Sequence, residues 1–335
     1  MTDEKELARP EPPIVGKVTH HSVELSWTAT ETETQDGNRM MYCVQEEEVN
    51  KTRGYGTVYN GYSQSCVCQG LDPNTQYHYR MRSMNQYEAS DWSPAVTVFT
   101  TRRPLTSEDL HKAVLAWDLE DVKRVLESKN VAVDVPDRLS LSALMIACQK
   151  GYRTVAEMLI DYGADVNYQS GSGKTSLMVA CYAGHLSVIH LLHEKGVQWT
   201  QKDKGGSSAI HYAVDGGQDN VIGYIVQNKL ADVNERDASQ WSPLLRAAAV
   251  NGHVGVADVL LTYGADIEAK DMYGRTSLML ASLNGHSEFV KVLLDHGANK
   301  TVENQYGANA VQFAESFQRT GVLEILEPGR LSSEA

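Results

Sequence analysis

A period of about 33 residues runs through the last two thirds of the chain and restricts its fold more than any other feature. The segment Thr175-Ser176-Leu177-Met178-Val179-Ala180 returns almost unchanged as Thr276-Ser277-Leu278-Met279-Leu280-Ala281. A hydroxyl residue recurs at intervals of 33 or 34 residues, and an asparagine takes its place at the end: Ser142, Thr175, Ser208, Ser242, Thr276 and Asn309. A repeat of this length is one supersecondary unit that buries its apolar face only against its neighbours. The sequence therefore predicts a stacked solenoid.

The repeated positions have separate physical roles in a pair of antiparallel helices. The hydroxyl residue caps the first helix, and a glycine that follows it in each unit turns the chain toward the second helix. These glycines are Gly151, Gly184, Gly217, Gly252 and Gly285. Apolar pairs such as Leu191-Leu192 then supply the buried face of the second helix. In the unit that starts at Ser242, one additional residue falls around Ala247-Ala248-Ala249, which predicts a bulge in the first helix.

Together these positions resemble the ankyrin repeat, in period, in the start of the first helix, in the glycine and in the closing segment Gly163-Ala164-Asp165-Val166-Asn167. The resemblance implies an all-α array over residues 108–327. About five full repeats lie between residues 138 and 304, and a degenerate capping unit is expected at each end. The resemblance also implies a concave protein-binding surface formed by hairpin tips and first helices.

Before residue 102 the pattern is that of short β-strands. Val18–Trp27 alternates apolar and polar residues, with Val23, Leu25 and Trp27 on one face, and Trp27 is interpreted as a core residue. The segment Leu71-Asp72-Pro73-Asn74-Thr75-Gln76-Tyr77 places a tyrosine after a turn at the start of a strand, as in a tyrosine corner. With Pro12-Pro13 and Trp92-Ser93-Pro94, these residues resemble a fibronectin type III domain. The resemblance implies an immunoglobulin-like all-β sandwich over residues 12–101.

The remaining segments are short. Residues 1–11 are expected to be a disordered N-terminus, 102–107 a short linker and 328–335 a flexible C-terminal tail. Thr106-Ser107-Glu108-Asp109 is a capping signature and predicts the start of the first helix of the array. Asp36-Gly37-Asn38 predicts a turn within the sandwich.

Charge and composition exclude several classes of partner. The net charge is −13 and both parts of the chain are acidic, which disfavours direct binding to the phosphate backbone of nucleic acid. No run of about 18 apolar residues occurs, so no membrane span is expected, and the acidic N-terminus does not have the pattern of a secretory signal. Five cysteines, an odd number without regular spacing, favour a reducing compartment.

Three motifs that could carry chemistry are better explained by structure. Gly171-Ser172-Gly173-Lys174-Thr175 ends like a phosphate-binding loop, but Tyr168 replaces the required first glycine. Cys66-Val67-Cys68 has no second ligand pair for zinc. Glu46-Glu47-Glu48 is interpreted as a solvated strand edge.

The histidines of the repeats lie too far apart to bind one metal ion and are predicted to hold hydrogen bonds between repeats. These residues are His185, His211, His253 and His286. We therefore expect no enzyme, no cofactor, no metal and no small-molecule substrate.

Aromatic and arginine residues gather at the hairpin tips of the C-terminal repeats. Alignment on the hydroxyl residue places Trp241, Tyr273, Arg275 and Tyr306 at equivalent or neighbouring tip positions. Residues of these types dominate the binding energy of protein interfaces, so the four are predicted to bind a protein partner. An alternative remains open, in which Tyr273 and Tyr306 pack against the neighbouring hairpins.

The function that agrees best with these sequence features is that of a non-enzymatic adaptor between proteins. The resemblance to proteins that combine these two domain families implies a place in the cytoplasm and nucleus of male germ cells, and also suggests the cilium. It further implies roles in transcription and cell survival. The alternative is a structural component of a ciliary or cytoskeletal assembly.

Overall fold

The computed structural model describes residues 7–29, 40–250 and 252–328. The chain divides into two compact units, residues 1–104 and 105–335. The predicted turn at Asp36-Gly37-Asn38, most of the predicted disordered N-terminus and nearly all of the predicted tail lie outside the described residues.

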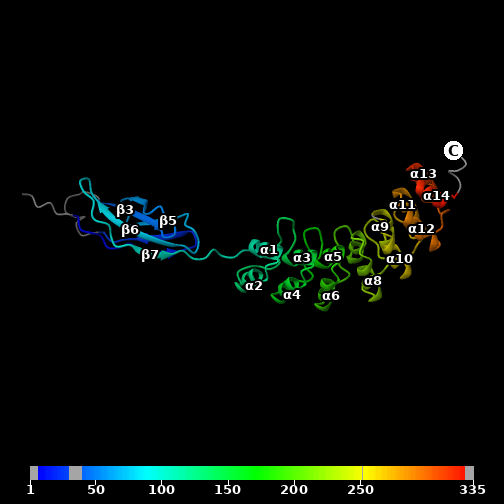
Figure 1. The fold of residues 1–335 in the computed structure, drawn as a ribbon, viewed down its shortest axis with the longest axis horizontal. Coiled ribbons are helices and arrows are strands. Elements are labelled where there is room, and N and C mark those ends of the chain that lie inside the picture. Colours follow the sequence, from blue (N-terminus) through cyan, green and yellow to red (C-terminus); the bar gives the residue numbers. More distant parts are fainter. Residues whose placement is uncertain (1–6, 30–39, 251, 329–335) are drawn as a thin grey trace, which may run out of the picture. The chain divides into compact units, whose positions relative to one another are not determined.

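The first unit is a sandwich of two antiparallel sheets (Figure 1). One sheet has the order β1-β2-β5, and its strands are β1 (Ile14–Val18), β2 (Ser22–Ser26) and β5 (Ser65–Gln69). The other has the order β4-β3-β6-β7, and its strands are β3 (Met41–Glu48), β4 (Gly56–Gly61), β6 (Gln76–Met84) and β7 (Val96–Phe99). The alternation in β2 buries Val23 and Leu25 between the sheets, where they join Trp27, Tyr42 and Tyr79. This confirms the predicted immunoglobulin-like sandwich.

The acidic run of β3 is not a strand edge. β3 lies between β4 and β6, so the interpretation of Glu46 as part of a solvated edge is wrong. The hydroxyl of Tyr79 donates a hydrogen bond to the Glu46 carboxylate at 2.7 Å. Burial raises the pKa of Glu46 above its ordinary value. The sheet order, which the local sequence does not specify, accounts for the difference.

Tyr77 forms the predicted tyrosine corner. The residue is 2% exposed, and its hydroxyl oxygen accepts a hydrogen bond of 2.8 Å from the backbone N–H of Asp72. The side chain therefore joins the core to the turn that precedes β6.

The corner can be tested by removing one atom. Tyr77→Phe keeps the ring but leaves the Asp72 amide without its acceptor, and we expect a loss of about 1–3 kcal/mol in the stability of the sandwich. Hydrogen exchange of the sandwich amides, read by mass spectrometry, measures this unit alone. An exchange pattern identical to that of the wild type would contradict the role given to the hydroxyl.

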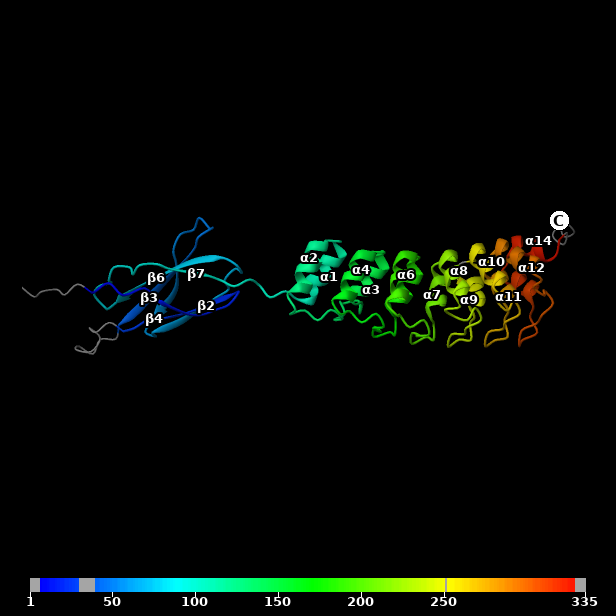
Figure 2. The same ribbon diagram turned by 90° about the horizontal axis from the view of Figure 1, so that it is seen from below.

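The second unit is an array of helix pairs, fourteen helices within the described residues. The first helices of the pairs are α1 (Ser107–Leu115), α3 (Ala143–Lys150), α5 (Ser176–Ala183), α7 (Ala209–Asp215), α9 (Pro243–Val250), α11 (Ser277–Asn284) and α13 (Ala310–Ser316). The second helices are α2 (Leu119–Glu127), α4 (Arg153–Asp161), α6 (Leu186–Glu194), α8 (Asp219–Gln227), α10 (Val254–Thr262), α12 (Ser287–Asp295) and α14 (Thr320–Leu326). Within this unit the second helices form a row along one edge, and the hairpin loops extend side by side from the other (Figures 1 and 2).

The caps of the helices follow the sequence pattern. Thr106 and Asp109 form a capping box at the start of α1, and the hydroxyl of Thr175 accepts the N–H of Met178 at 3.2 Å at the start of α5. Gly151 ends α3 with φ 74°, a left-handed conformation that glycine adopts without strain. A side chain there would also meet the ring of His185 from the next repeat. The glycine thus turns the chain and makes room for its neighbour.

The additional residue near Ala247 does not bulge a helix. α9 is a continuous helix of eight residues, as many as α3, so the extra position comes after Val250. The prediction of a bulge within Ala247–Ala249 is therefore wrong. An insertion in a connection leaves the packed helices in register, whereas one inside a helix would rotate every later side chain.

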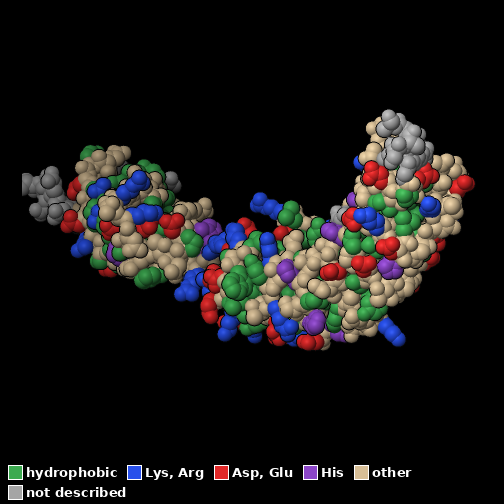
Figure 3. All heavy atoms as spheres, turned by 45° about the vertical axis from the view of Figure 1, so that its right-hand side comes forward, with side chains coloured by type: hydrophobic (Ala, Val, Ile, Leu, Met, Phe, Trp, Pro, Cys, Tyr) green, Lys and Arg blue, Asp and Glu red, His purple; other side chains and the backbone are tan. Residues whose placement is uncertain are grey.

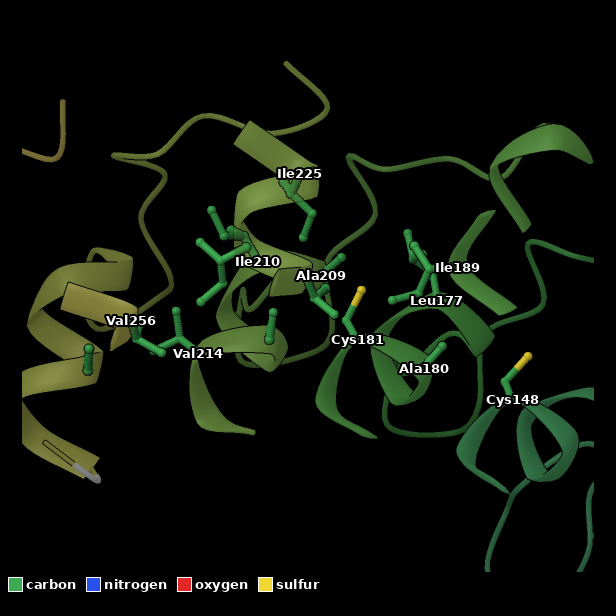
Figure 4. Packing of buried hydrophobic residues seen from close by; sticks show 14 of the residues in the cluster. Cys148, Leu177, Ala180, Cys181, Ile189, Ala209, Ile210, Val214, Ile225 and Val256 are labelled. Carbon is green, nitrogen blue, oxygen red and sulfur yellow. The ribbon is translucent and has the colours of Figure 1, made fainter. Parts of the chain in front are cut away.

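The core of the array is continuous from α1 to α14. Figure 4 shows part of it, with side chains from successive helix pairs directed into a shared interior. Cys148 and Cys181 are fully buried there, and burial raises the pKa of both thiols. All five cysteines are free. Cys148 and Cys181 therefore act as small apolar residues rather than reactive thiols.

Candidate protein-binding surface

A polar side chain fixes the backbone of each hairpin tip. In one hairpin the carboxylate of Asp271 accepts the N–H groups of Tyr273 and Arg275, both at 2.9 Å. In the next hairpin the side-chain oxygen of Asn304 accepts the N–H of Tyr306 at 2.9 Å. These bonds form because Asp and Asn readily accept backbone N–H groups two residues further on. The two tyrosines therefore project from a backbone that is already ordered.

Neighbouring tips are also bonded to each other. The backbone N–H of Gln305 donates to the carbonyl of Tyr273 at 3.3 Å, and its side-chain amide donates to the carbonyl of Met272 at 3.0 Å. Met272, Tyr273 and Tyr306 are 51%, 45% and 76% exposed. We call these three residues the tip patch. They are exposed, largely apolar side chains on two adjacent hairpins that are bonded to each other.

Trp241 has a different environment from the tip patch. Its side chain is only partly exposed and packs against the core of the array. Its carbonyl accepts a hydrogen bond of 3.3 Å from the ring of His211. Much of the indole surface is thus already used in packing, and the binding role of Trp241 stays a prediction.

Arg275 is held by its own hairpin. Its guanidinium lies 2.7–2.8 Å from the carboxylate of Asp271, which is fully buried, and 4.9 Å from the centre of the Tyr273 ring. The arginine therefore neutralises a buried charge and supports one face of the tyrosine ring. This contact orients Tyr273 within the tip patch.

A charged network beneath the tips was not predicted from the sequence. Arg246 of α9 makes a two-point ion pair with Asp215 of the preceding repeat, at 2.6 and 2.8 Å. It also reaches Asp237 at 3.2 Å and the hydroxyl of Ser207 at 2.7 Å. The available signal is that Arg246 stands four residues after the hydroxyl residue, where other repeats carry apolar or aromatic side chains: Ile146, Val179, Tyr212, Leu280 and Phe313.

The repeat histidines hold neighbouring units together where their rings have partners. The ring of His185 bonds the carbonyl of Gln149 in the preceding repeat at 3.1 Å, and that of His211 bonds the carbonyl of Trp241 in the following one. Burial, together with the charge of Arg246, lowers the pKa of His211 below its ordinary value and so favours the neutral ring. The prediction of inter-repeat hydrogen bonds is confirmed for these two residues.

The motifs that suggested other chemistry belong to the repeat. Gly173 has φ 82° in a hairpin tip, and Thr175 caps α5, so the segment that ends like a phosphate-binding loop is one of the repeat hairpins. Among the described residues no group of three or more His, Cys, Asp or Glu side chains could hold a metal ion. No helix in the described ranges is long and apolar enough to cross a membrane. On the face of the array shown in Figure 3, acidic and basic side chains are interspersed.

Comparisons with known proteins agree with this architecture. The fibronectin type III domain matches residues 8–99, and ankyrin repeats match residues 110–203, 196–271 and 248–330. A mouse relative, "Fibronectin type 3 and ankyrin repeat domains 1 protein", is 43% identical over 279 residues, and a human relative, "Fibronectin type 3 and ankyrin repeat domains protein 1", is 42% identical over 278. Each match covers 82% of this chain and 80% of the relative. The chain belongs to the family of fibronectin type 3 and ankyrin repeat domains proteins.

A solved structure supports the fold of the array. The crystal structure of the human ASB11 ankyrin repeat domain is 26% identical, with a TM-score of 0.55, and the match covers 63% of this chain and 95% of that one. Both domain types of the family are typically non-catalytic interaction modules, and no enzymatic family is indicated. The domain composition thus supports a protein-interaction adaptor.

Proposed function

We propose that the chain is a non-enzymatic adaptor whose tip patch binds a segment of a partner protein. The observation that carries the proposal is the exposure of Met272, Tyr273 and Tyr306 on adjacent hairpins with an ordered backbone. Aromatic side chains on a rigid support lose little conformational freedom on binding. More of the free energy gained when they are buried therefore contributes to the affinity. Arg275, held against Tyr273, belongs to the same surface as a positioning residue.

The proposal places the chain in the cytoplasm and nucleus, with roles in transcription and cell survival in male germ cells. The family resemblance supports these roles and also suggests the cilium. Five free thiols support a reducing compartment, where buried cysteines stay unpaired. The fibronectin type III unit then offers a second interaction surface on the same chain.

The tip patch can be tested by the double substitution Tyr273→Ala/Tyr306→Ala. Affinity purification of the full chain, followed by mass spectrometry, identifies partners captured by the wild type. Loss of two interface tyrosines is expected to weaken binding by roughly thirtyfold, because a hot spot contributes about 2 kcal/mol or more. The melting temperature is expected to stay unchanged, since exposed tips add little to the stacked core. Tyr87→Ala is the matched control, because Tyr87 is 83% exposed in the other unit.

Three outcomes contradict the proposal. Full capture by the double variant places the partner elsewhere on the chain. A lowered melting temperature of the double variant would show that the two tyrosines pack between hairpins. Retention of the wild-type protein in the insoluble fraction after detergent and moderate salt favours a structural component instead of an exchanging adaptor.

A further inference from the structure

A groove with a volume of about 500 Å³ lies on the second helices, between α8 and α10. In Figure 1 these helices form the row opposite the hairpin loops, so the groove is separate from the tip patch. The residues that shape it are Asp219, Gly223, Tyr224, Asp258 and Tyr263. We call it the outer-helix groove.

Gly223 opens the floor of this groove. It is the middle residue of α8, where the other full-length second helices carry a larger side chain: Lys123, Glu157, His190, Asp258 and Lys291. Glycine is among the least favourable residues inside a helix. Yet a Cβ atom at Gly223 would meet no atom within 4 Å, and the residue does not have a positive φ. Neither packing nor backbone conformation requires glycine here, and its effect is to leave the groove open.

The aromatic walls are held in place by their own neighbours. The ring of Tyr224 stacks on His190, with centroids 4.6 Å apart, and lies 6.4 Å from the ring of Trp199. The hydroxyl of Tyr263 accepts a hydrogen bond of 2.7 Å from the side-chain amide of Gln227. Ring faces fixed in this way attract a cation without first having to become ordered.

The charge of the groove is negative. Asp219 and Asp258 are both exposed, and neither forms an ion pair with any residue that the structure describes. No lysine or arginine is among the described residues that line the groove. A second glycine, Gly255, leaves room for the carboxylate of Asp219. One oxygen of that carboxylate lies 3.1 Å from the place where a Cβ of Gly255 would stand. Two carboxylates beside two tyrosine rings suit a planar cation.

We propose that the outer-helix groove is a second protein-binding site, which takes an arginine side chain from a basic segment of a partner protein. The guanidinium lies over Gly223, pairs with the carboxylates of Asp219 and Asp258, and stacks on the tyrosine rings. Arginine fits better than lysine because its flat group both stacks on an aromatic ring and binds a carboxylate at two points. This site would let one array hold two partners on opposite edges.

The proposal can be tested with a defined probe. The peptide acetyl-Gly-Arg-Gly-amide is titrated into the full chain, and backbone amide shifts are followed by NMR. Its counterpart has citrulline, a neutral side chain of the same shape, in place of arginine. We expect saturable shifts at Gly223 and Tyr224 with the arginine peptide, and binding weaker by about tenfold or more with citrulline or in Asp219→Asn/Asp258→Asn.

A substitution that fills the groove provides a second, independent test of the proposal. Gly223→Leu is expected to abolish the shifts without lowering the melting temperature, because leucine is a far better helix former and meets open space. Lys291→Leu, at the same position of α12, is the control and is expected to bind like the wild type. Shifts spread over many acidic surfaces, equal binding of citrulline, or binding that survives Gly223→Leu would overturn the proposal. A lowered melting temperature in Gly223→Leu would overturn it too, by showing that the glycine serves packing.

Discussion

Replacement of Trp27 by alanine is expected to destabilise the β-sandwich by about 3–5 kcal/mol, because it leaves a large cavity in a small core. Trp27 is 5% exposed, and the centroids of the Tyr42 and Tyr59 rings lie 5.7 and 5.6 Å from its ring. Hydrogen exchange of the sandwich amides measures the effect without interference from the array. If those amides stay as protected as in the wild type, Trp27 is not the centre of this core.

Trp27→Phe separates the volume of the ring from its polar atom. The indole nitrogen of Trp27 is buried and has no hydrogen-bond partner among the described residues. Phenylalanine removes this unsatisfied donor while it keeps part of the ring, so the expected loss is smaller than for alanine, about 1–2 kcal/mol. Equal losses for the two variants would show that ring volume is not the main contribution.

Replacement of Arg246 by alanine is expected to destabilise the array by about 3 kcal/mol. The side chain of Asp237 is 8% exposed and that of Asp215 19%, so both carboxylates would remain poorly solvated without their cation. Arg124→Ala is the matched control. Arg124 pairs with Asp121 at 3.0 Å on an exposed helix surface, and removal of such a pair changes stability by less than about 1 kcal/mol.

The origin of the Arg246 effect can be checked in a double variant. If the loss comes from an uncompensated carboxylate, Arg246→Leu/Asp215→Leu should be more stable than Arg246→Leu alone. Urea unfolding of the array, followed by helical circular dichroism, compares the variants. Additive losses would contradict the ion-pair explanation and indicate that each side chain contributes through packing alone.

Several features of this protein could be read from local sequence. The 33-residue period predicts stacked helix pairs because each pair has its own cap, turn and apolar face within one unit. Alternation in β2 predicts a half-buried strand because successive side chains point to opposite faces of a sheet. Tyr77 predicts its corner because its partner, Asp72, is only five residues away. In each case the groups that interact are near neighbours in the chain.

Other features depend on which repeats and strands lie next to each other. Both Trp241 and Tyr273 are aromatic tip residues in the sequence, but only packing shows that the first is partly buried and the second exposed. Asp215, which makes the two-point ion pair with Arg246, is 31 residues away from it in the chain. Gly223 forms a groove only beside Tyr263 of the next repeat. Local patterns thus determined the domains and their helices and strands. The tertiary structure decided which side chains remain exposed, because burial and ion pairing depend on neighbours that the chain supplies from a distance.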